Sequence, residues 1–157
     1  MSGLAFRDFS HITVRVSDME RALAFYREGL GLRQLFDVKL EGPGLESVTG
    51  AKGARGRMIG FVVPGAGKVS IELIHFEHPP LTPPPEGRFT GWGNISLSVA
   101  EIDAAHAECV ARGLAPLSPP VEVGGVRMFF LTDPDGARVE IIEFSQGHTT
   151  SAAWNGA

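Results

Sequence analysis

The sequence is poor in cysteine, in net positive charge and in long hydrophobic runs. Its 157 residues include one cysteine, Cys109, which excludes an internal disulfide and a multi-cysteine zinc site and suits a reducing cytoplasm. Lys and Arg number 14 against 18 Asp and Glu, and this net charge of -4 argues against nucleic acid or an anionic membrane surface as a partner. No apolar run is long enough to cross a bilayer, and the first residues do not read as a signal peptide. We therefore expect a cytoplasmic protein with no nucleic-acid or membrane partner.

What the sequence does contain is an internal repeat. The stretch "SHITVRVSDMERALAFY" begins at Ser10, and a looser copy, "GNISLSVAEIDAAHAEC", begins at Gly93. Each copy opens with strict apolar alternation, typical of a strand, and continues with apolar residues at helical spacing. In the first copy we expect Ser17 to begin the helix, with Glu20 as its capping-box partner, and the Gly29 and Gly31 pair to end it after Leu30.

Three further extended segments follow each helix, so the order β-α-β-β-β occurs twice. In the first copy a Gly-rich loop at 42–56 separates two of them, and in the second the turn "DPDG" precedes the last. The predicted fold class is α+β, with two tandem βαβββ modules whose mixed sheets curve around a shared cavity. The predicted organisation is an N-terminal segment (1–8), module 1 (9–76), a Pro-rich linker (77–91), module 2 (92–144) and a loose tail (145–157).

Each module places a carboxylate in the middle of its last strand. Glu72 in "KVSIELI" and Glu140 in "ARVEIIE" lie on the face opposite the apolar stripe, where an unpaired charge is costly to bury. His11 and Asn94 head the first strands of the two modules. If the faces opposite the helices surround one cavity, these four residues converge as a mixed nitrogen and oxygen site for a divalent metal. Taken singly, His11 also fits a structural histidine, and each glutamate also fits a solvated residue on an open sheet face.

With these motifs the chain resembles the vicinal oxygen chelate superfamily, through "HITVRVSDMERALAFYREGLGL", "VSIELI", "NISLSVAEIDAA" and "DPDGARVEIIE". The resemblance covers roughly residues 9–144 and is strongest to glyoxalase I and methylmalonyl-CoA epimerase-like members. It implies that His11, Glu72 and Glu140 are metal ligands. Asn94 occupies the position where metal-dependent members usually have a second histidine. This difference speaks against an extradiol dioxygenase or a fosfomycin-resistance enzyme.

The resemblance predicts a divalent-metal-dependent isomerase, epimerase or lyase of a small oxygenated substrate, which reacts through a metal-stabilised enolate. The cofactor would be a divalent Mn, Ni, Zn, Co, Mg or Fe ion. We expect Glu140 or Glu72 to act as the base, with Glu41 and Glu46 of the Gly-rich loop as alternatives, and Asn94 to be a fourth ligand or a substrate contact. The alternative is a non-catalytic protein that sequesters a small molecule without metal, like the bleomycin-resistance members.

Four apolar side chains are candidates for the walls of a substrate pocket, and core packing is the alternative for each: Phe61, Trp92, Met128 and Phe129. Because relatives commonly dimerise, we also expect a homodimer.

Overall fold

The computed structural model describes residues 10–65, 70–83, 93–123 and 125–148. In this part of the chain no helix is both long enough and apolar enough to cross a membrane. The chain divides into two compact units. Unit 1 holds the described residues up to Leu23 together with Gly31–Pro83, and unit 2 holds the segment Ala24–Leu30 together with the described residues from Gly93 onwards.

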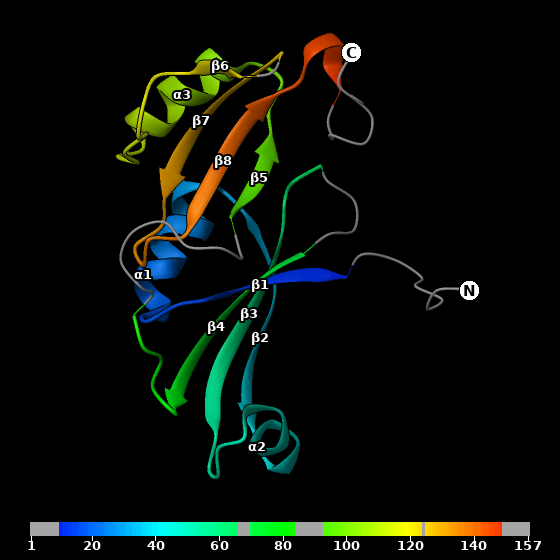
Figure 1. Ribbon diagram of the computed structural model, residues 1–157, viewed down its shortest axis with the longest axis vertical. Helices are drawn as coiled ribbons and strands as arrows, with labels where there is room; N and C mark the ends of the chain where they lie inside the picture. The colour runs from blue at the N-terminus through cyan, green and yellow to red at the C-terminus, as the bar shows by residue number, and fades with distance from the viewer. Residues whose placement is uncertain (1–9, 66–69, 84–92, 124, 149–157) are drawn as a thin grey trace, which may run out of the picture. The chain divides into compact units, whose positions relative to one another are not determined.

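Unit 1 is built on a four-stranded sheet of order β1-β4-β3-β2 (Figure 1). Its β1 and β4 are parallel, whereas β3 is antiparallel to both of its neighbours, β4 and β2. The sheet comes with two short helices. The elements are β1 (His11–Arg15), α1 (Met19–Leu23), β2 (Arg33–Glu41), α2 (Pro43–Thr49), β3 (Arg55–Val62) and β4 (Ser70–His78).

Unit 2 repeats this arrangement with a four-stranded sheet of order β5-β8-β7-β6, in which β5 and β8 are parallel. The two mixed sheets confirm the predicted α+β fold of tandem βαβββ modules. The elements are η1 (a π-helix, Ala24–Gly29), β5 (Asn94–Ser98), α3 (Ile102–Ala111), β6 (Val121–Val123), β7 (Val126–Thr132), β8 (Arg138–Glu143) and η2 (a 3-10 helix, Ser145–Gly147).

Each sheet has one apolar face, which follows from the period-two alternation of its strands. In unit 2 this face packs against α3, where the His106 ring meets the Phe129 ring edge-on with centroids 5.1 Å apart. We call the opposite face, which carries Glu72 in unit 1 and Glu140 in unit 2, the carboxylate face. The buried side chains of the two apolar faces include Val14, Ile59, Phe61, Ile71 and Leu73 in unit 1, and Ile95, Phe129, Leu131, Val139 and Ile141 in unit 2.

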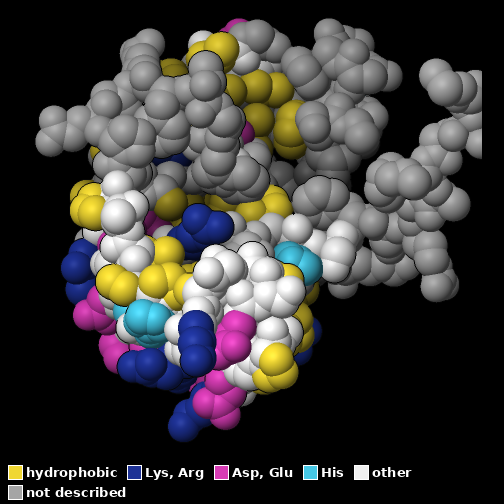
Figure 2. Space-filling view, turned by 60° about the horizontal axis from the view of Figure 1, so that its bottom comes forward, with side chains coloured by type: hydrophobic (Ala, Val, Ile, Leu, Met, Phe, Trp, Pro, Cys, Tyr) yellow, Lys and Arg dark blue, Asp and Glu magenta, His cyan; other side chains and the backbone are white. Residues whose placement is uncertain are grey.

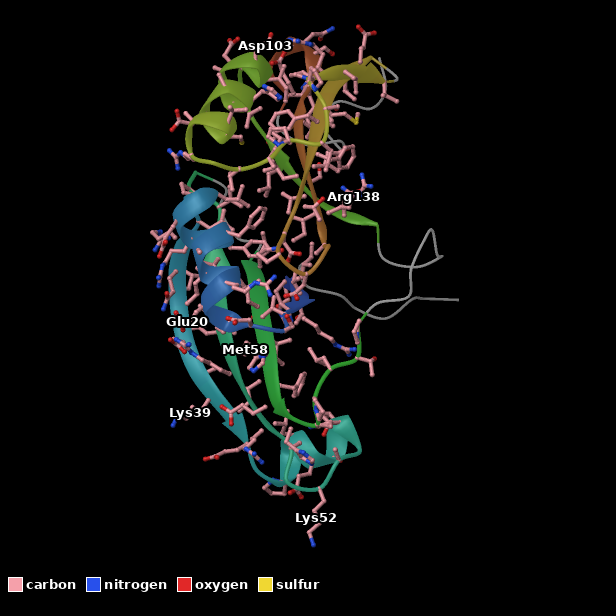
Figure 3. The ribbon with its side chains drawn as sticks, turned by 90° about the vertical axis from the view of Figure 1, so that its left-hand side faces the viewer. Glu20, Lys39, Lys52, Met58, Asp103 and Arg138 are labelled. Carbon is pink, nitrogen blue, oxygen red and sulfur yellow. The ribbon has the colours of Figure 1, made fainter. Side chains whose placement is uncertain are left out.

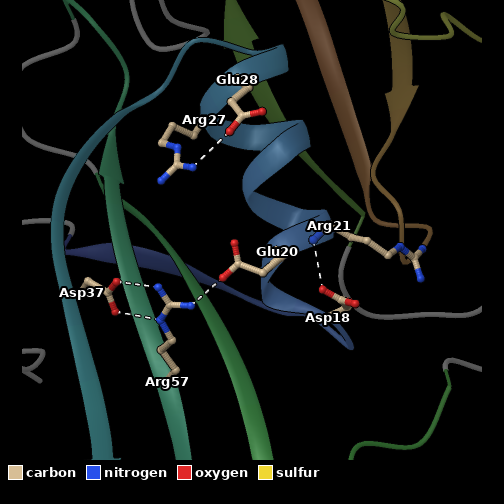
Figure 4. Close-up of polar contacts among 7 residues, drawn as sticks. All are labelled: Asp18, Glu20, Arg21, Arg27, Glu28, Asp37 and Arg57. Atoms are coloured by element: carbon tan, nitrogen blue, oxygen red, sulfur yellow. Dashed lines mark hydrogen bonds and ion pairs between the residues drawn. The ribbon is translucent and has the colours of Figure 1, made fainter.

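The N-terminus of α1 differs from the prediction. The helix is capped by Asp18, whose Oδ1 accepts a hydrogen bond of 3.0 Å from the Arg21 backbone N–H, and not by Ser17. Glu20 does not complete a capping box, because its carboxylate pairs with Arg57 Nη1 on β3 at 2.9 Å (Figure 4). A guanidinium offers the Glu20 carboxylate a charged partner, which a neutral backbone N–H does not.

Two further features of this region differ from the prediction in detail. The predicted helix does run as far as Gly29, but it is α-helical only to Leu23 and then becomes the π-helix Ala24–Gly29. The loop predicted at 42–56 contains α2, which spans Pro43–Thr49 and is followed by Gly50 in the left-handed conformation, with a φ of 67°. Figure 2 brings this end of unit 1 forward and shows acidic and basic side chains interspersed on that face.

A buried hydrogen bond anchors the segment Ala24–Leu30 within unit 2. Tyr26 Oη donates to Asp133 Oδ2 at 2.9 Å, and both side chains are buried. The other carboxylate oxygen of Asp133 accepts from the backbone N–H groups of Asp135 and Ala137 and so closes the "DPDG" turn. Burial raises the pKa of Asp133, and these hydrogen bonds oppose the rise. The pKa of Tyr26 is also raised, by burial first and by the neighbouring Asp133 carboxyl second.

Candidate functional site

The first group of candidate residues lies on the carboxylate face of unit 1, where β1 runs beside β4. Thr13 is the register partner of Glu72, so His11, two residues earlier on the same strand, shares a face with that glutamate. His11 Nε2 lies 3.4 Å from Glu72 Oε2, and the two side chains are 41% and 12% exposed. The other ring nitrogen, Nδ1, lies 2.9 Å from Ser10 Oγ. An imidazole nitrogen and a carboxylate oxygen are thus held side by side.

An aromatic ring lies next to this pair. The register partner of Glu72 on β3 is Gly60, and the partner of Gly60 on β2 is Phe36. A Cβ added at Gly60 would overlap the Phe36 ring, so Gly60 leaves room for the ring to lie over β3 on the carboxylate face. Sequence reasoning missed Phe36 because a register shift between Gln34 and Phe36 breaks the period of two that predicts which face a residue occupies.

The second group of candidate residues lies on the carboxylate face of unit 2. Glu140 is the register partner of Ser96, whose Oγ donates to Glu140 Oε2 at 2.6 Å. Asn94 Nδ2 lies 3.5 Å from the same oxygen, at the limit of a hydrogen bond. Phe130 is the partner of Glu140 on the other side, so an aromatic residue occupies in unit 2 the place of Gly60 in unit 1. The two carboxylates therefore lie at matching positions of their sheets, as the repeat predicted.

Hydrogen bonding differs between the two carboxylates. Glu72 has an imidazole as its neighbour, whereas Glu140 has a hydroxyl and an amide. Within the described ranges, no three His, Cys, Asp or Glu side chains come together as a group that could hold a metal ion. The three-residue ligand set of His11, Glu72 and Glu140 therefore stays a prediction.

The four candidate pocket residues lie in different parts of the structure. Phe61 and Phe129 are fully buried on the apolar faces, as the register partners of Ile71 and Ile141, so they belong to the core and we leave them out of the site. Met128 is half-buried and lies on the carboxylate face, two residues before Phe130. Trp92 lies outside the described residues.

The two alternative bases have other partners or positions. Glu46 Oε1 accepts a hydrogen bond of 2.6 Å from the Gly53 backbone N–H, which ties α2 to the following loop. Glu41 is exposed at the end of β2, where Arg55 is its register partner on β3. Cys109 is half-buried, and burial raises the pKa of its thiol, so it is held in the unreactive protonated form.

Three further histidines have other surroundings. His75 Nδ1 lies 3.1 Å from the Val16 carbonyl oxygen, and His106 packs on Phe129. His148 lines a pocket of about 460 Å³ at the carboxyl ends of β5 and β8, together with Glu101 and Glu143. Glu143 Oε2 accepts from the Ile102 backbone N–H at 2.6 Å and so caps α3.

Comparisons with known proteins agree with this architecture. The sequence model of the Glyoxalase/Bleomycin resistance protein/Dioxygenase superfamily matches residues 8–141. A crystal structure of a glyoxalase family protein from Bacillus cereus is similar with a TM-score of 0.76 and 21% identity, over 91% of this chain and 97% of that one. A superfamily member from Sphaerobacter thermophilus is similar with a TM-score of 0.64 and 28% identity, over 89% and 99% of the two chains. The lactoylglutathione lyase of Haemophilus influenzae is 28% identical over 141 residues, which span 85% of this chain and 90% of the relative.

Paired βαβββ units, each with a carboxylate in the middle of its last strand, define a protein of the glyoxalase fold. The chain belongs to the Glyoxalase/Bleomycin resistance protein/Dioxygenase superfamily, which confirms the resemblance seen in its motifs. Members of this superfamily bind small-molecule substrates and are typically metal-dependent.

Proposed function

We propose that this protein is a divalent-metal-dependent isomerase, epimerase or lyase that acts on a small oxygenated substrate. The observation that carries the proposal is the contact of 3.4 Å between His11 Nε2 and Glu72 Oε2, a nitrogen and an oxygen donor on adjacent strands. Membership of the superfamily supports metal dependence. The similarity to a lactoylglutathione lyase supports the reaction class.

Three side chains would hold the metal: His11, Glu72 and Glu140. Imidazole nitrogen together with carboxylate oxygen suits divalent Mn, Ni, Zn, Co, Mg or Fe, so the chemistry of this donor set fits the group. Ser96 and Asn94 both contact Oε2 of Glu140, and among the described residues no hydrogen bond is made to Oε1, which could therefore coordinate the metal. Asn94 would add its amide oxygen as a fourth ligand or contact the substrate.

When bound, a divalent ion supplies positive charge beside the substrate oxygens and so makes the adjacent C–H bond more acidic. Glu140 or Glu72 would remove that proton onto a carboxylate oxygen and return it to complete the reaction. Ser96 orients the Glu140 carboxylate by donating to Oε2 at 2.6 Å. Phe36 and Phe130, the aromatic neighbours of the two carboxylates, would limit the access of water to the proton being transferred.

Metal analysis of protein purified without chelator tests this proposal. We expect stoichiometric divalent metal in the native protein and its loss in His11→Ala and Glu140→Gln. Glu77→Gln is the matched control, because Glu77 is exposed and pairs with Arg55 at 3.3 Å, and it should keep the metal. Native protein that holds no metal after growth and purification with added divalent ions would overturn the proposal.

A second candidate function is binding or sequestering of a small molecule without metal or turnover. The observation that favours it is the hydrogen bonding of Glu140 to the neutral donors Ser96 and Asn94, which satisfies a carboxylate oxygen without a metal. Removing the metal by exhaustive chelation separates the two functions. A sequestering protein would bind its ligand equally well afterwards, whereas the enzyme would lose its metal and its activity. A homodimer and a cytoplasmic location stay predictions, which sedimentation and cell fractionation would test.

A further inference from the structure

Arg138 lies on the carboxylate face of unit 2, at the first position of β8. It is the register partner of Asn94 on β5, and it shares its face with Glu140, two residues further along the same strand. The side chain is exposed. Figure 3 shows Arg138 extending from the sheet on the side away from α3. A permanent positive charge therefore lies next to two of the candidate residues.

The Arg138 guanidinium has an aromatic contact but, among the residues that the structure describes, no acidic partner. Its Cζ lies over the Phe130 ring, 5.8 Å from the centroid, within the range of a cation–π interaction. In the described part of the chain no carboxylate lies within ion-pair distance of Arg138. By contrast, five other arginines each pair with an acid: Arg27, Arg55, Arg57, Arg112 and Arg127.

The nearby acid has other partners. Glu140 Oε2 accepts from Ser96 Oγ at 2.6 Å and lies 3.5 Å from Asn94 Nδ2, so neutral groups hold this carboxylate in place of the guanidinium. The contact with Phe130 restricts the long Arg138 side chain, and its N–H groups donate to none of the described residues. A restrained guanidinium with free donors suits a carboxylate, which it can bind through two parallel hydrogen bonds.

The first module has no such charge at this position. The register partner of His11 on β4 is Ser70, as Arg138 is the partner of Asn94 on β8. The repeat therefore carries one arginine where its symmetry would allow two. A charge at this position would orient a ligand within unit 2, because an anionic group at one end of the ligand would be held beside Asn94.

We propose that Arg138, held over the Phe130 ring beside Asn94, binds a carboxylate group of the substrate, so that the substrate class is a small carboxylate with neighbouring oxygens. This inference rests on the proposed function, since it places the anionic end of the substrate in the same site as Glu140. It gives Arg138 a role in substrate binding and specificity, whereas the proton transfer belongs to a glutamate.

Binding of pyruvate and of its neutral isostere pyruvamide, followed by amide chemical shifts of the full-length protein, tests the inference. We expect saturable binding of pyruvate to the native protein, about tenfold or more weaker in Arg138→Gln, because a charge-assisted bidentate contact is lost. Arg138→Lys should bind with intermediate affinity, since it keeps the charge but not the planar fork. Arg33→Gln is the matched control, because Arg33 is an exposed arginine on β2 of unit 1, and it should bind pyruvate like the native protein.

The inference is overturned if the native protein shows no saturable pyruvate binding, or if Arg33→Gln weakens it as much as Arg138→Gln does. It is also overturned if Arg138→Gln weakens pyruvamide as much as pyruvate, because the effect would then not depend on the anion. Metal content is measured on each variant. Pyruvate binding that depends on Arg138 in a protein without metal would support the inference and count against the proposed function, so the two failures are distinguishable.

Discussion

Arg57 on β3 and Glu20 on α1 form an ion pair of 2.9 Å that joins the first helix of the chain to a strand of its sheet (Figure 4). Unit 2 contains the same relationship, because Arg127 on β7 pairs with Asp103 on α3 at 2.8 Å. Glu20 and Asp103 are each the second residue of their helix, and each arginine precedes a methionine that faces an isoleucine on the neighbouring strand. Each module thus has one ion pair that connects a helix to a strand of the sheet. We infer that this pair serves the scaffold, since in each unit the arginine lies on the sheet face opposite the carboxylate face.

Removing either arginine should change the titration of its acidic partner. Hydrogen bonds from Arg57 lower the pKa of Asp37, and those from Arg127 lower the pKa of Asp103. Because these folded-state values lie below the unfolded value, the stability the pairs contribute is present above about pH 4 and is lost as the pH falls through the folded pKa. In Arg57→Gln the carboxyl resonance of Asp37 should titrate at higher pH while that of Asp103 is unchanged, and Arg127→Gln should show the reverse. If both resonances move in either variant, the pairs are not independent.

Asp133 should tolerate asparagine far better than alanine. Alanine would leave the Tyr26 hydroxyl and the backbone N–H groups of Asp135 and Ala137 without an acceptor, at a cost of about 3 kcal/mol in the free energy of unfolding. Asparagine keeps an acceptor for the turn and a donor for Tyr26, and the control Tyr26→Phe should lose only about 1 kcal/mol. Urea denaturation measures all three, and equal losses for Ala and Asn would contradict this account.

The same position predicts a pH dependence of stability. Burial raises the pKa of Asp133 in the folded state, so the proton is bound more tightly by the folded than by the unfolded chain. The native protein should therefore gain stability relative to Asp133→Asn as the pH falls through the folded-state pKa of Asp133 towards the ordinary aspartate value of about 3.9. A difference in unfolding free energy that stays constant over this range would show that the carboxyl does not titrate differently in the two states.

Gly56 should be one of the least replaceable glycines. A Cβ there would overlap the backbone carbonyl of His75, on the strand paired with β3, and backbone cannot move aside as a side chain can. We expect Gly56→Ala to lower the free energy of unfolding by about 2 kcal/mol or more. Gly44→Ala is the control, because a Cβ at Gly44 in α2 would meet no atom within 4 Å, and it should be neutral or slightly stabilising. Thermal unfolding of the two variants would decide the matter, with equal melting temperatures as the contrary result.

Replacing Asn94 by histidine should strengthen metal binding. An imidazole nitrogen is a better donor than an amide oxygen for ions such as Zn²⁺ and Co²⁺, and we expect at least about a tenfold gain in affinity. Ser98→His provides a matched control, because it adds an imidazole to the same face of β5, four residues away. Titration with Co²⁺, followed by its visible absorption, measures both. A similar gain in both variants would show that any added histidine recruits the metal and that Asn94 has no special position.

Local patterns were enough to predict the sheets and the matching positions of the two glutamates. The alternation around Ile71 and Leu73, repeated around Val139 and Ile141, depends only on neighbouring residues, and the register then follows from burying one face of each strand. The contact between His11 and Glu72 agrees with the shared face that this reasoning assigned to them.

The features that the sequence did not predict depend on contacts between distant segments or on exceptions to the period. Glu20 fits a capping box by spacing, but its partner, Arg57, lies 37 residues away and decides its role. Phe36 was missed because of an irregular register, and α2 was hidden by glycines that suggest a loop. The acceptor for Tyr26 lies 107 residues along the chain, beyond the reach of any local pattern.

The segment Ala24–Leu30 has a consequence for dissecting the protein. It precedes the second strand of the first repeat in sequence, yet it packs as part of unit 2, with Tyr26 inside that unit. A protein cut between the repeats, or a gene split there, would separate Asp133 from the hydroxyl that it binds. The duplicated halves are thus no longer interchangeable building blocks: the second half produced alone would lack the segment Ala24–Leu30, and the first half would leave Tyr26 without its acceptor.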